Sequence, residues 1–260
     1  MIEEAVSRLA AAGCDSPRLD AELLLAHVLG VDRSAVVTRG AQPLDDATQA
    51  RFDELVERRA GREPLAYIVG VKAFRNIELQ VDQRVMIPRP DTETLVEVAV
   101  DTAARGAHVH DVGTGSGAVA LALKEERPDL RVTASDSSPG AVEVARANAA
   151  ALRLDVAVEI ANGLPPGDYD LVVANLPYVR EDEWDSLEPE IRVHEPREAL
   201  LSGDDGLDAI RSLVVQLEPR TQVALEHAPD QADAVRELLR DAHTVKDLAG
   251  RDRVTVGVAP

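Results

Sequence analysis

The sequence predicts an α/β protein in which a doubly wound, mostly parallel sheet follows a small bundle of helices. Beyond Gly106, short apolar runs alternate with helical segments, as expected of parallel strands joined by right-handed crossover helices. From Met1 to about Gly61, apolar residues instead recur at three- and four-residue spacing, as they do on the buried faces of packed helices.

The N-terminal segment, residues 1–62, is expected to contain three to five helices. Glycines at Gly13, Gly30 and Gly40-Ala41 interrupt the helical pattern. Ser16-Pro17 and Leu44-Asp45-Asp46 are typical helix starts, with a capping side chain followed by proline or an acidic first turn. Because the segment has no catalytic constellation, we interpret it as a substrate-docking domain.

Residues 63–88 are expected to form a β-hairpin linker. Ala73–Val81 alternates as a single strand would, and Val85–Ile87 could continue it. Pro88-Arg89-Pro90 then stiffens the chain before a capped helix. The second domain is therefore assigned to residues 89–260.

The second domain is expected to contain seven strands, the last two forming an antiparallel hairpin. The expected strands are Val109–Val112, Arg131–Ala134, Val156–Ile160, Tyr169–Ala174, Gln222–Leu225, Thr244–Leu248 and Arg253–Val258. Between them, helices are expected at Ala118–Glu126, Pro139–Leu152, Leu207–Leu217 and Asp230–Asp241.

Composition restricts the class of partner and the compartment. The formal net charge is −19, which repels phosphate backbones and disfavours direct nucleic-acid binding. Cys14 is the only cysteine, so the chain has neither an internal disulfide nor a cysteine-based metal site. Apolar runs are too short to span a bilayer, and Glu3-Glu4 replaces the basic start of a signal peptide. We expect a cytoplasmic monomer that binds neither a metal nor a membrane.

A glycine-rich turn follows the first strand of the second domain. Asp111-Val112-Gly113-Thr114-Gly115-Ser116-Gly117 ends that strand and leads into a helix. Such glycines let the backbone approach a ligand where a Cβ would collide. Asp136 ends the next strand, where a carboxylate can accept both hydroxyls of a ribose. Together these residues predict a nucleoside-containing cofactor.

The spacing of the glycines distinguishes between cofactors. Asp-x-Gly-x-Gly-x-Gly is typical of class I methyltransferases that use S-adenosylmethionine, whereas the dinucleotide fingerprint places its last glycine one residue later. The loop alone leaves a dehydrogenase as the alternative. For a methyltransferase, Asp111 suits the ammonium of the methionine moiety. Asn162, with Gly163 beside it, suits the adenine edge.

The fourth strand leads directly into Asn175-Leu176-Pro177-Tyr178, which we call the clamp. Open α/β sheets bind ligands at the carboxyl ends of their strands. The Asn175 side-chain carbonyl and the Leu176 backbone carbonyl can accept both hydrogens of a planar NH₂ group, and the following Pro177 keeps Leu176 extended. Tyr178 can cover the flat face of the acceptor group. The clamp thus predicts methylation of an amide or adenine nitrogen, by positioning.

On these residues the chain resembles the HemK/PrmC family of protein-glutamine methyltransferases over essentially its whole length. The resembling blocks are Ile87–Glu93, the glycine loop, the clamp, Glu195–Leu200, Gly203–Leu207, Leu225–His227 and Asp247–Thr255. The resemblance implies a class I, Rossmann-like methyltransferase with a seven-stranded sheet after a helical bundle and hairpin. It also implies S-adenosylmethionine as cofactor, and the Gly-Gly-Gln glutamine of class I peptide chain release factors as substrate.

By the same resemblance, Gly113–Gly117, Asp136 and Asn175 contact the cofactor, and Asn175–Tyr178 hold the substrate glutamine. The sequence departs from the family at two places. Leu176 replaces the usual proline of the clamp, and Ala161–Leu164 lacks the usual aspartate and bulky residue.

Three alternative functions remain open at this point. A related branch of glutamine methyltransferases acts on a ribosomal protein and carries a similar clamp. Enzymes that methylate adenine amino groups in RNA or DNA also have similar clamps. A non-catalytic module that senses the cofactor is the third alternative.

The remaining polar candidates lie outside the glycine loop and the clamp. His110, His194 and His227 have no metal-ligand spacing and are interpreted as structural. Arg89 is expected to pair with a carboxylate in the hinge, with a position facing the cofactor as the alternative. The acidic run Glu181-Asp182-Glu183 is interpreted as a solvated helix start that could also meet a basic release-factor surface.

Overall fold

The computed structural model describes residues 1–39 and 42–260, which form two compact units. The first unit contains Met1–Val71 with Glu188–His194, and the second contains Lys72–Leu187 with Glu195–Pro260. The predicted break at Gly40-Ala41 lies outside the described residues. Within the described ranges, the helices are all too short or too polar to cross a membrane.

The first unit is a set of helices around an apolar core that includes the fully buried Phe52. Its helices are α1 (Ile2–Ala11), α2 (Pro17–Leu29), α3 (Arg33–Arg39), α4 (Asp46–Ala60), α5 (Leu65–Val69) and α9 (Pro189–His194). Pro17 begins α2, and the Asp45 carboxylate caps α4 by accepting from the Thr48 N–H at 2.9 Å. Both helices therefore start where the sequence predicts, because proline lacks an N–H and aspartate accepts one that the first turn leaves unpaired. The predicted cap at Ser16 is not formed, since its side chain makes no capping hydrogen bond to α2.

A buried ion cluster joins α9 to the N-terminal helices of this unit. Arg59 donates to Asp20 at 2.7 Å and to Glu190 at 2.9 Å. Arg62 pairs with the same Glu190 carboxylate. Each buried charge thus has an opposite partner, without which its desolvation would cost several kcal/mol.

A two-stranded hairpin follows, formed by β1 (Val71–Phe74) and β2 (Ile77–Gln80). The prediction of one strand over Ala73–Val81 is wrong, because Arg75 adopts a left-handed φ of 47° and reverses the chain. Residues 85–87 are not a strand, and instead lead toward the pocket described below.

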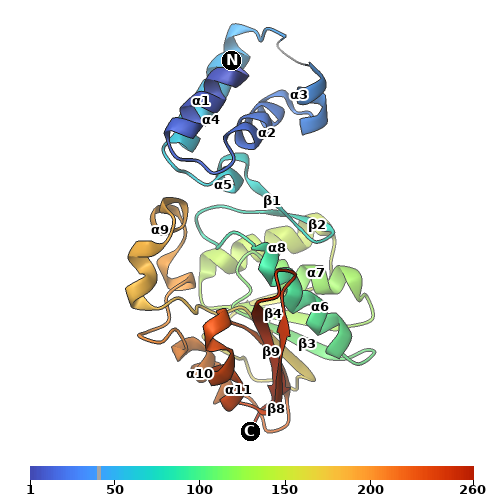
Figure 1. Cartoon of the computed structure of the whole chain (residues 1–260). Helices are drawn as coiled ribbons and strands as arrows, with labels where there is room; N and C mark the ends of the chain where they lie inside the picture. Colours follow the sequence, from blue (N-terminus) through green and yellow to red (C-terminus); the bar gives the residue numbers. More distant parts are fainter. Residues whose placement is uncertain (40–41) are drawn as a thin grey trace. The chain divides into compact units, whose positions relative to one another are not determined.

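The second unit contains the seven-stranded sheet (Figure 1). Its strands are β3 (His108–Val112), β4 (Arg131–Asp136), β5 (Ala157–Ile160), β6 (Leu171–Ala174), β7 (Gln222–Glu226), β8 (Arg240–Lys246) and β9 (Asp252–Val258). Its helical segments are η1 (Pro90–Thr92), α6 (Glu93–Thr102), α7 (Ala118–Glu126), α8 (Pro139–Leu152), η2 (Glu181–Ser186), η3 (Arg197–Ala199), α10 (Asp208–Val214), η4 (Pro229–Gln231) and α11 (Ala232–Glu237).

The strand order, β5-β4-β3-β6-β7-β9-β8, confirms the predicted mostly parallel sheet. Strands β3 to β7 are parallel, and β9 pairs antiparallel with both β7 and β8. The predicted helix over Asp230–Asp241 extends too far, since β8 already begins at Arg240, which pairs with Val258. The conformation of the residues after Glu237 is therefore determined by pairing with β9 rather than by local helix propensity.

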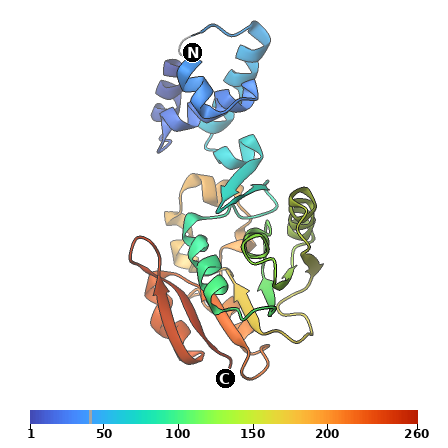
Figure 2. The same cartoon turned by 90° about the vertical axis from the view of Figure 1, so that its right-hand side faces the viewer.

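Helices cover both faces of the sheet (Figure 1 and Figure 2). Helices α10 and α11 pack against one face, where Val172 and Val223 are fully buried. Helix α6 packs on β6 and β7, and α7 and α8 pack on β3, β4 and β5. All four residues of β6 are buried, which explains why this strand is a continuous apolar run rather than an alternating one.

The chain order reverses between β3 and β6. From β3 the chain moves outward to β4 and β5, and then returns to place β6 on the other side of β3. Such a reversal opens a crevice at the carboxyl ends of the two adjacent strands, where α/β folds bind ligands. The glycine loop follows β3 and the clamp follows β6, so both predicted motifs meet at this crevice.

Candidate active site

The glycine loop connects β3 to α7 in a conformation that favours glycine. Gly113, Gly115 and Gly117 have φ values of 72°, 56° and 87°. A Cβ on Gly113 would lie 2.8 Å from Leu176 Cδ2. The missing side chain therefore lets the loop and the clamp approach each other closely.

Asp136 ends β4 with its carboxylate fixed by the backbone. Its Oδ2 accepts from the Gly115 N–H and its Oδ1 from the Ser138 N–H, both at 2.9 Å. Each carboxylate oxygen has a further lone pair, so Asp136 can still accept two hydroxyls of a ligand in the pocket that it lines.

Asp111 is a buried carboxyl, 2% exposed, on the wall of the same pocket. Its Oδ2 accepts from the Thr114 hydroxyl at 2.6 Å and from the Ala120 N–H at 3.2 Å. Burial raises the pKa of Asp111 to about 7, although these hydrogen bonds oppose the rise. A cation entering the pocket would stabilise the ionised form of this carboxyl.

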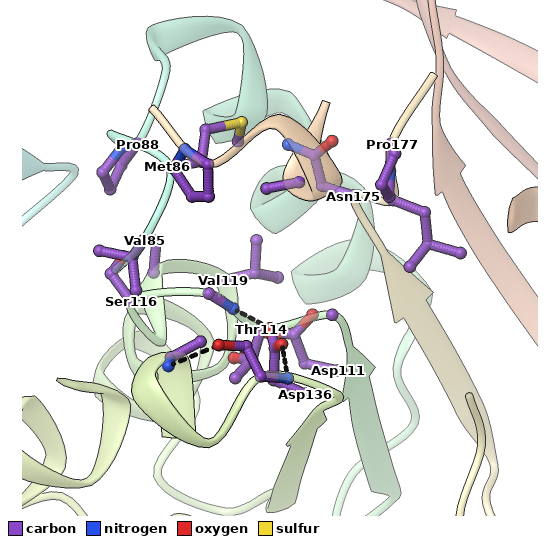
Figure 3. A pocket seen from close by; sticks show the side chains of 18 of the residues that line it. Val85, Met86, Pro88, Asp111, Thr114, Ser116, Val119, Asp136, Asn175 and Pro177 are labelled. Atoms are coloured by element: carbon purple, nitrogen blue, oxygen red, sulfur yellow. Dashed lines mark hydrogen bonds between the residues drawn. The ribbon is translucent and has the colours of Figure 1, made fainter. Parts of the chain in front are cut away.

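The clamp follows the end of β6 and lines the pocket on the side opposite Thr114 and Asp136. Figure 3 shows Asn175 and Pro177 across the pocket from Thr114 and Asp136. The Asn175 Nδ2 donates to the Thr92 hydroxyl at 3.0 Å. Tyr178 instead turns its hydroxyl toward the buried carboxylate of Glu226, 3.5 Å away.

The side chain of Leu176, which stands where the resembled family usually has proline, has an apolar environment on the wall of the pocket. It lies against Gly113 and packs against the core beneath the sheet. Substitution of proline by leucine is therefore compatible with the fold, because the larger side chain has an apolar place to pack.

The structure adds several residues to the pocket that sequence reasoning did not assign. They come from the stretch after the hairpin, from the start of α8 and from the segment around η3, namely Arg84, Val85, Met86, Pro88, Thr92, Ala118, Val119, Ser137, Ser138, Ala141, Pro196, Glu198 and Ala199. Figure 3 shows Val85, Met86 and Pro88 along one flank. Of this set, the sequence pointed only to the members that lie in the resembling blocks Ile87–Glu93 and Glu195–Leu200. The others could not be assigned, because apolar lining residues have no motif of their own.

Asn162 and Gly163 are not brought to this pocket. Among the described residues that line it, none comes from the turn after β5. Gln216 lies against Gly163 and accepts from the Leu164 N–H at 3.0 Å. A contact of this turn with adenine stays a prediction.

Arg89 pairs with Glu195, whose side chain is only 1% exposed and also accepts from the Ile87 N–H. The pair ties the stretch before α6 to the segment that lines the pocket at Pro196. Arg89→Ala would leave the Glu195 carboxylate buried without a cation, and is expected to lower the free energy of unfolding by about 2–3 kcal/mol. Urea denaturation of the parent and the variant measures this difference in the free energy of unfolding.

The matched control for that prediction is Arg211→Ala, which removes an exposed pair with Asp205. It is expected to cost less than about 1 kcal/mol. Equal losses in the two variants would show that the Arg89–Glu195 pair does not stabilise the pocket wall.

Fold and site together define a class I methyltransferase, with a glycine turn after β3, an acidic residue after β4 and an Asn-x-Pro-Tyr clamp after β6. A family model described as the PrmC N-terminal domain matches residues 1–70, and one described as the methyltransferase small domain matches residues 90–203. Curated relatives extend this result to nearly the full length.

The chain is 41% identical to the release factor glutamine methyltransferase of Caulobacter vibrioides, over 98% of this chain and 93% of that protein. It is 42% identical to that of Mycolicibacterium smegmatis, over 97% and 94%. The chain belongs to the family of release factor glutamine methyltransferases.

A methyltransferase from Pyrococcus furiosus has a similar fold, with a TM-score of 0.52 at 17% identity, covering 71% of this chain and 89% of that one. These findings confirm the predicted family, fold class and enzyme class, with S-adenosylmethionine as the methyl donor. The dehydrogenase and the non-catalytic sensor are thereby not supported.

Proposed function

We propose that this enzyme transfers a methyl group from S-adenosylmethionine to the side-chain amide nitrogen of the Gly-Gly-Gln glutamine in class I peptide chain release factors. The observation that carries the proposal is that clamp residues Asn175, Leu176 and Pro177 line one pocket together with the glycine loop and Asp136. Acceptors for an NH₂ group thus lie across from residues suited to a nucleoside.

The residues present fit S-adenosylmethionine. Asp136 would accept from the ribose hydroxyls, and the buried Asp111 carboxyl would pair with the ammonium of the methionine moiety. A Cβ on Gly115 would meet no atom within 4 Å, so the backbone there is open to a ligand. When bound, the cofactor supplies a methyl group on a positively charged sulfur.

The clamp orients the substrate rather than activating it. With its Nδ2 committed to Thr92, Asn175 has Oδ1 available to accept one N–H of the glutamine, and the Leu176 carbonyl would accept the other. The nitrogen lone pair then faces the methyl carbon. On transfer from a bound cofactor, the amide nitrogen would gain its bond to the methyl carbon as the C–S bond breaks, and would then lose one proton to water. Positioning for in-line attack is the main catalytic contribution.

A labelled methyl group tests the proposal directly. Purified enzyme should transfer label from S-adenosylmethionine to a class I release factor, and the label should disappear when the loop glutamine is replaced by alanine. Nuclease-sensitive incorporation into ribosomal RNA, or transfer that survives the loop substitution, would instead overturn the glutamine assignment.

Cofactor affinity is expected to depend on pH through Asp111. Burial raises its pKa to about 7, and an ammonium pairs with the ionised form. Affinity should therefore fall as pH drops below that value, by roughly tenfold from about pH 7.5 to about pH 6. This range lies below the usual pKa of an α-amino group. Isothermal titration calorimetry measures the effect, and a profile unchanged in Asp111→Asn would assign it to another group.

The domain assignments complete the proposal. Residues 1–62 would dock the release factor, residues 63–88 would link, and residues 89–260 would carry out the transfer. The acidic run Glu181-Asp182-Glu183 would contribute charge to docking. A release-factor substrate implies action in the cytoplasm, where translation occurs.

A further inference from the structure

A buried polar cluster formed by Thr92 and Glu226 contacts the clamp at Asn175 and Tyr178, and the mechanism above does not use it. Glu226, at the end of β7, is 1% exposed. Its Oε1 accepts from the Thr92 hydroxyl at 3.2 Å and from the Tyr178 hydroxyl at 3.5 Å. Its Oε2 is buried without a hydrogen-bond partner among the described residues. One carboxyl thus contacts Tyr178 directly and reaches Asn175 through Thr92.

The single hydrogen of the Thr92 hydroxyl determines how this cluster is oriented. A carboxylate can only accept, so Thr92 must donate its hydrogen to Glu226. The hydroxyl oxygen is then left as an acceptor, and Asn175 donates its Nδ2 to it at 3.0 Å. The Nδ2 end of the Asn175 amide therefore faces Thr92, and the Oδ1 end faces away.

Rotation of the Asn175 amide by half a turn would break this arrangement. Oδ1 would then face the Thr92 oxygen, and two acceptors, Oδ1 and the Glu226 carboxylate, would compete for one hydrogen. Thr92 could then donate to only one of them, so either the Asn175 Oδ1 or the Glu226 carboxylate would lose its hydrogen bond from Thr92, which is costly. In the rotated form, Asn175 would also present N–H groups to the N–H groups of the substrate.

We propose that Thr92 and Glu226 are positioning residues that fix the orientation of the Asn175 side chain, so that its Oδ1 faces the nitrogen to be methylated. This proposal rests on the proposed function for the identity of that nitrogen. It assigns a role to Thr92, within the resembling block Ile87–Glu93, and to Glu226, within Leu225–His227.

Protonation of Glu226 does not disturb this orientation. Burial raises the pKa of Glu226 to about 7, while Thr92 and Arg253 lower it and Asp91 raises it. Because Oε1 already accepts two hydrogen bonds, an added proton belongs on Oε2, and Oε1 continues to accept from Thr92. Burial also raises the pKa of Tyr178 to about 12, so this hydroxyl remains a donor. A glutamine at position 226 can reproduce the protonated form.

We call Glu226, Thr92 and Asn175, joined by these hydrogen bonds, the relay. Four variants test it kinetically, with matched pairs at both positions. Thr92→Val and Glu226→Leu remove the hydrogen bonds, whereas Thr92→Ser and Glu226→Gln can keep them. We expect the first two to lower kcat by about tenfold to thirtyfold, and the second two to stay within about threefold of the parent. The KM for the release factor and the calorimetric cofactor affinity should change by less than about threefold. The double variant Thr92→Val/Glu226→Leu should be no slower than the slower single variant.

Wild-type kcat in Thr92→Val, failure of serine to restore it, or losses that multiply in the double variant would each overturn the relay. A merely structural role would lower thermal stability and cofactor affinity together with kcat, in all four variants.

Hydrogen exchange of the asparagine side chains is a second test. It uses the parent enzyme without substitutions and does not depend on methyl transfer. The chain has four asparagines, Asn76, Asn148, Asn162 and Asn175, so selective ¹⁵N labelling of their side chains gives four assignable NH₂ groups. Asn148 donates to Gln80 and Ser116 and is buried, whereas Asn76 and Asn162 are exposed. These are internal references for slow and fast hydrogen exchange.

We expect the Asn175 amide to exchange at least about tenfold more slowly than Asn76 and Asn162. Exchange as fast as in those two would overturn the relay even if the enzyme methylates release factors. Slow exchange without methyl transfer to a release factor would contradict the proposed function and leave the relay intact.

Discussion

Asn175→Ala is expected to lower kcat by about 10²–10³-fold while leaving the affinity for S-adenosylmethionine within about fivefold of the parent. The amide lies at the end of β6, where it lines the pocket and donates to Thr92. Alanine removes the acceptor that would hold one hydrogen of the substrate nitrogen. Asp111, Asp136 and the glycine loop, which would bind the cofactor, are unchanged. Single-turnover methyl transfer and calorimetry separate the two effects.

The control for this substitution is Asn76→Ala, which makes the same change on the exposed hairpin turn. It should leave both kcat and cofactor affinity unaltered. An Asn175→Ala enzyme with kcat within threefold of the parent would remove the clamp from the mechanism.

Asp136→Ala is expected to weaken S-adenosylmethionine binding by about 10²–10³-fold, because it would remove the two charge-assisted hydrogen bonds proposed between this carboxylate and the ribose. The carboxylate also holds the Gly115 and Ser138 N–H groups at 2.9 Å, so its loss loosens the loop as well. Calorimetry with S-adenosylmethionine and with its demethylated product should show the same loss, since both carry the ribose.

Asp129→Ala is the matched control for Asp136. Asp129 also accepts a backbone N–H, from Gly106 at 3.1 Å, and it pairs with Arg127 outside the pocket. Its replacement should leave cofactor affinity within about twofold of the parent. If the two variants bound the cofactor equally well, Asp136 would not be the ribose acceptor.

The main features of the fold and the chemistry at the sheet edge could be predicted because local sequence determines them. The β6 residues form a continuous apolar run that is buried on both faces. Strand ends fix the positions of the polar residues that follow, so Asn175 and Asp136 could be assigned to one crevice before any contact was known. His110 and His227 are buried with both ring nitrogens hydrogen-bonded to protein groups, in accord with their structural interpretation.

The relay could not be predicted because its partners are distant in sequence. Asn175 and Thr92 are 83 residues apart, and Thr92 and Glu226 are 134 residues apart. Arg75 is a different case, since a left-handed φ at an arginine has no sequence signal. The alternating pattern of Ala73–Val81 continues through this turn, so the sequence predicted one strand where the structure has two.

Mass spectrometry of release factors from cells with and without this enzyme tests the central claim most directly. Peptides that contain the Gly-Gly-Gln loop should carry one additional methyl group on the glutamine when the enzyme is present. The modification should vanish when the gene is deleted, and should return with the parent enzyme but not with Asn175→Ala. Methylation of that glutamine that persists in the deletion strain, or loss of methylation from a ribosomal protein or RNA instead, would contradict the account.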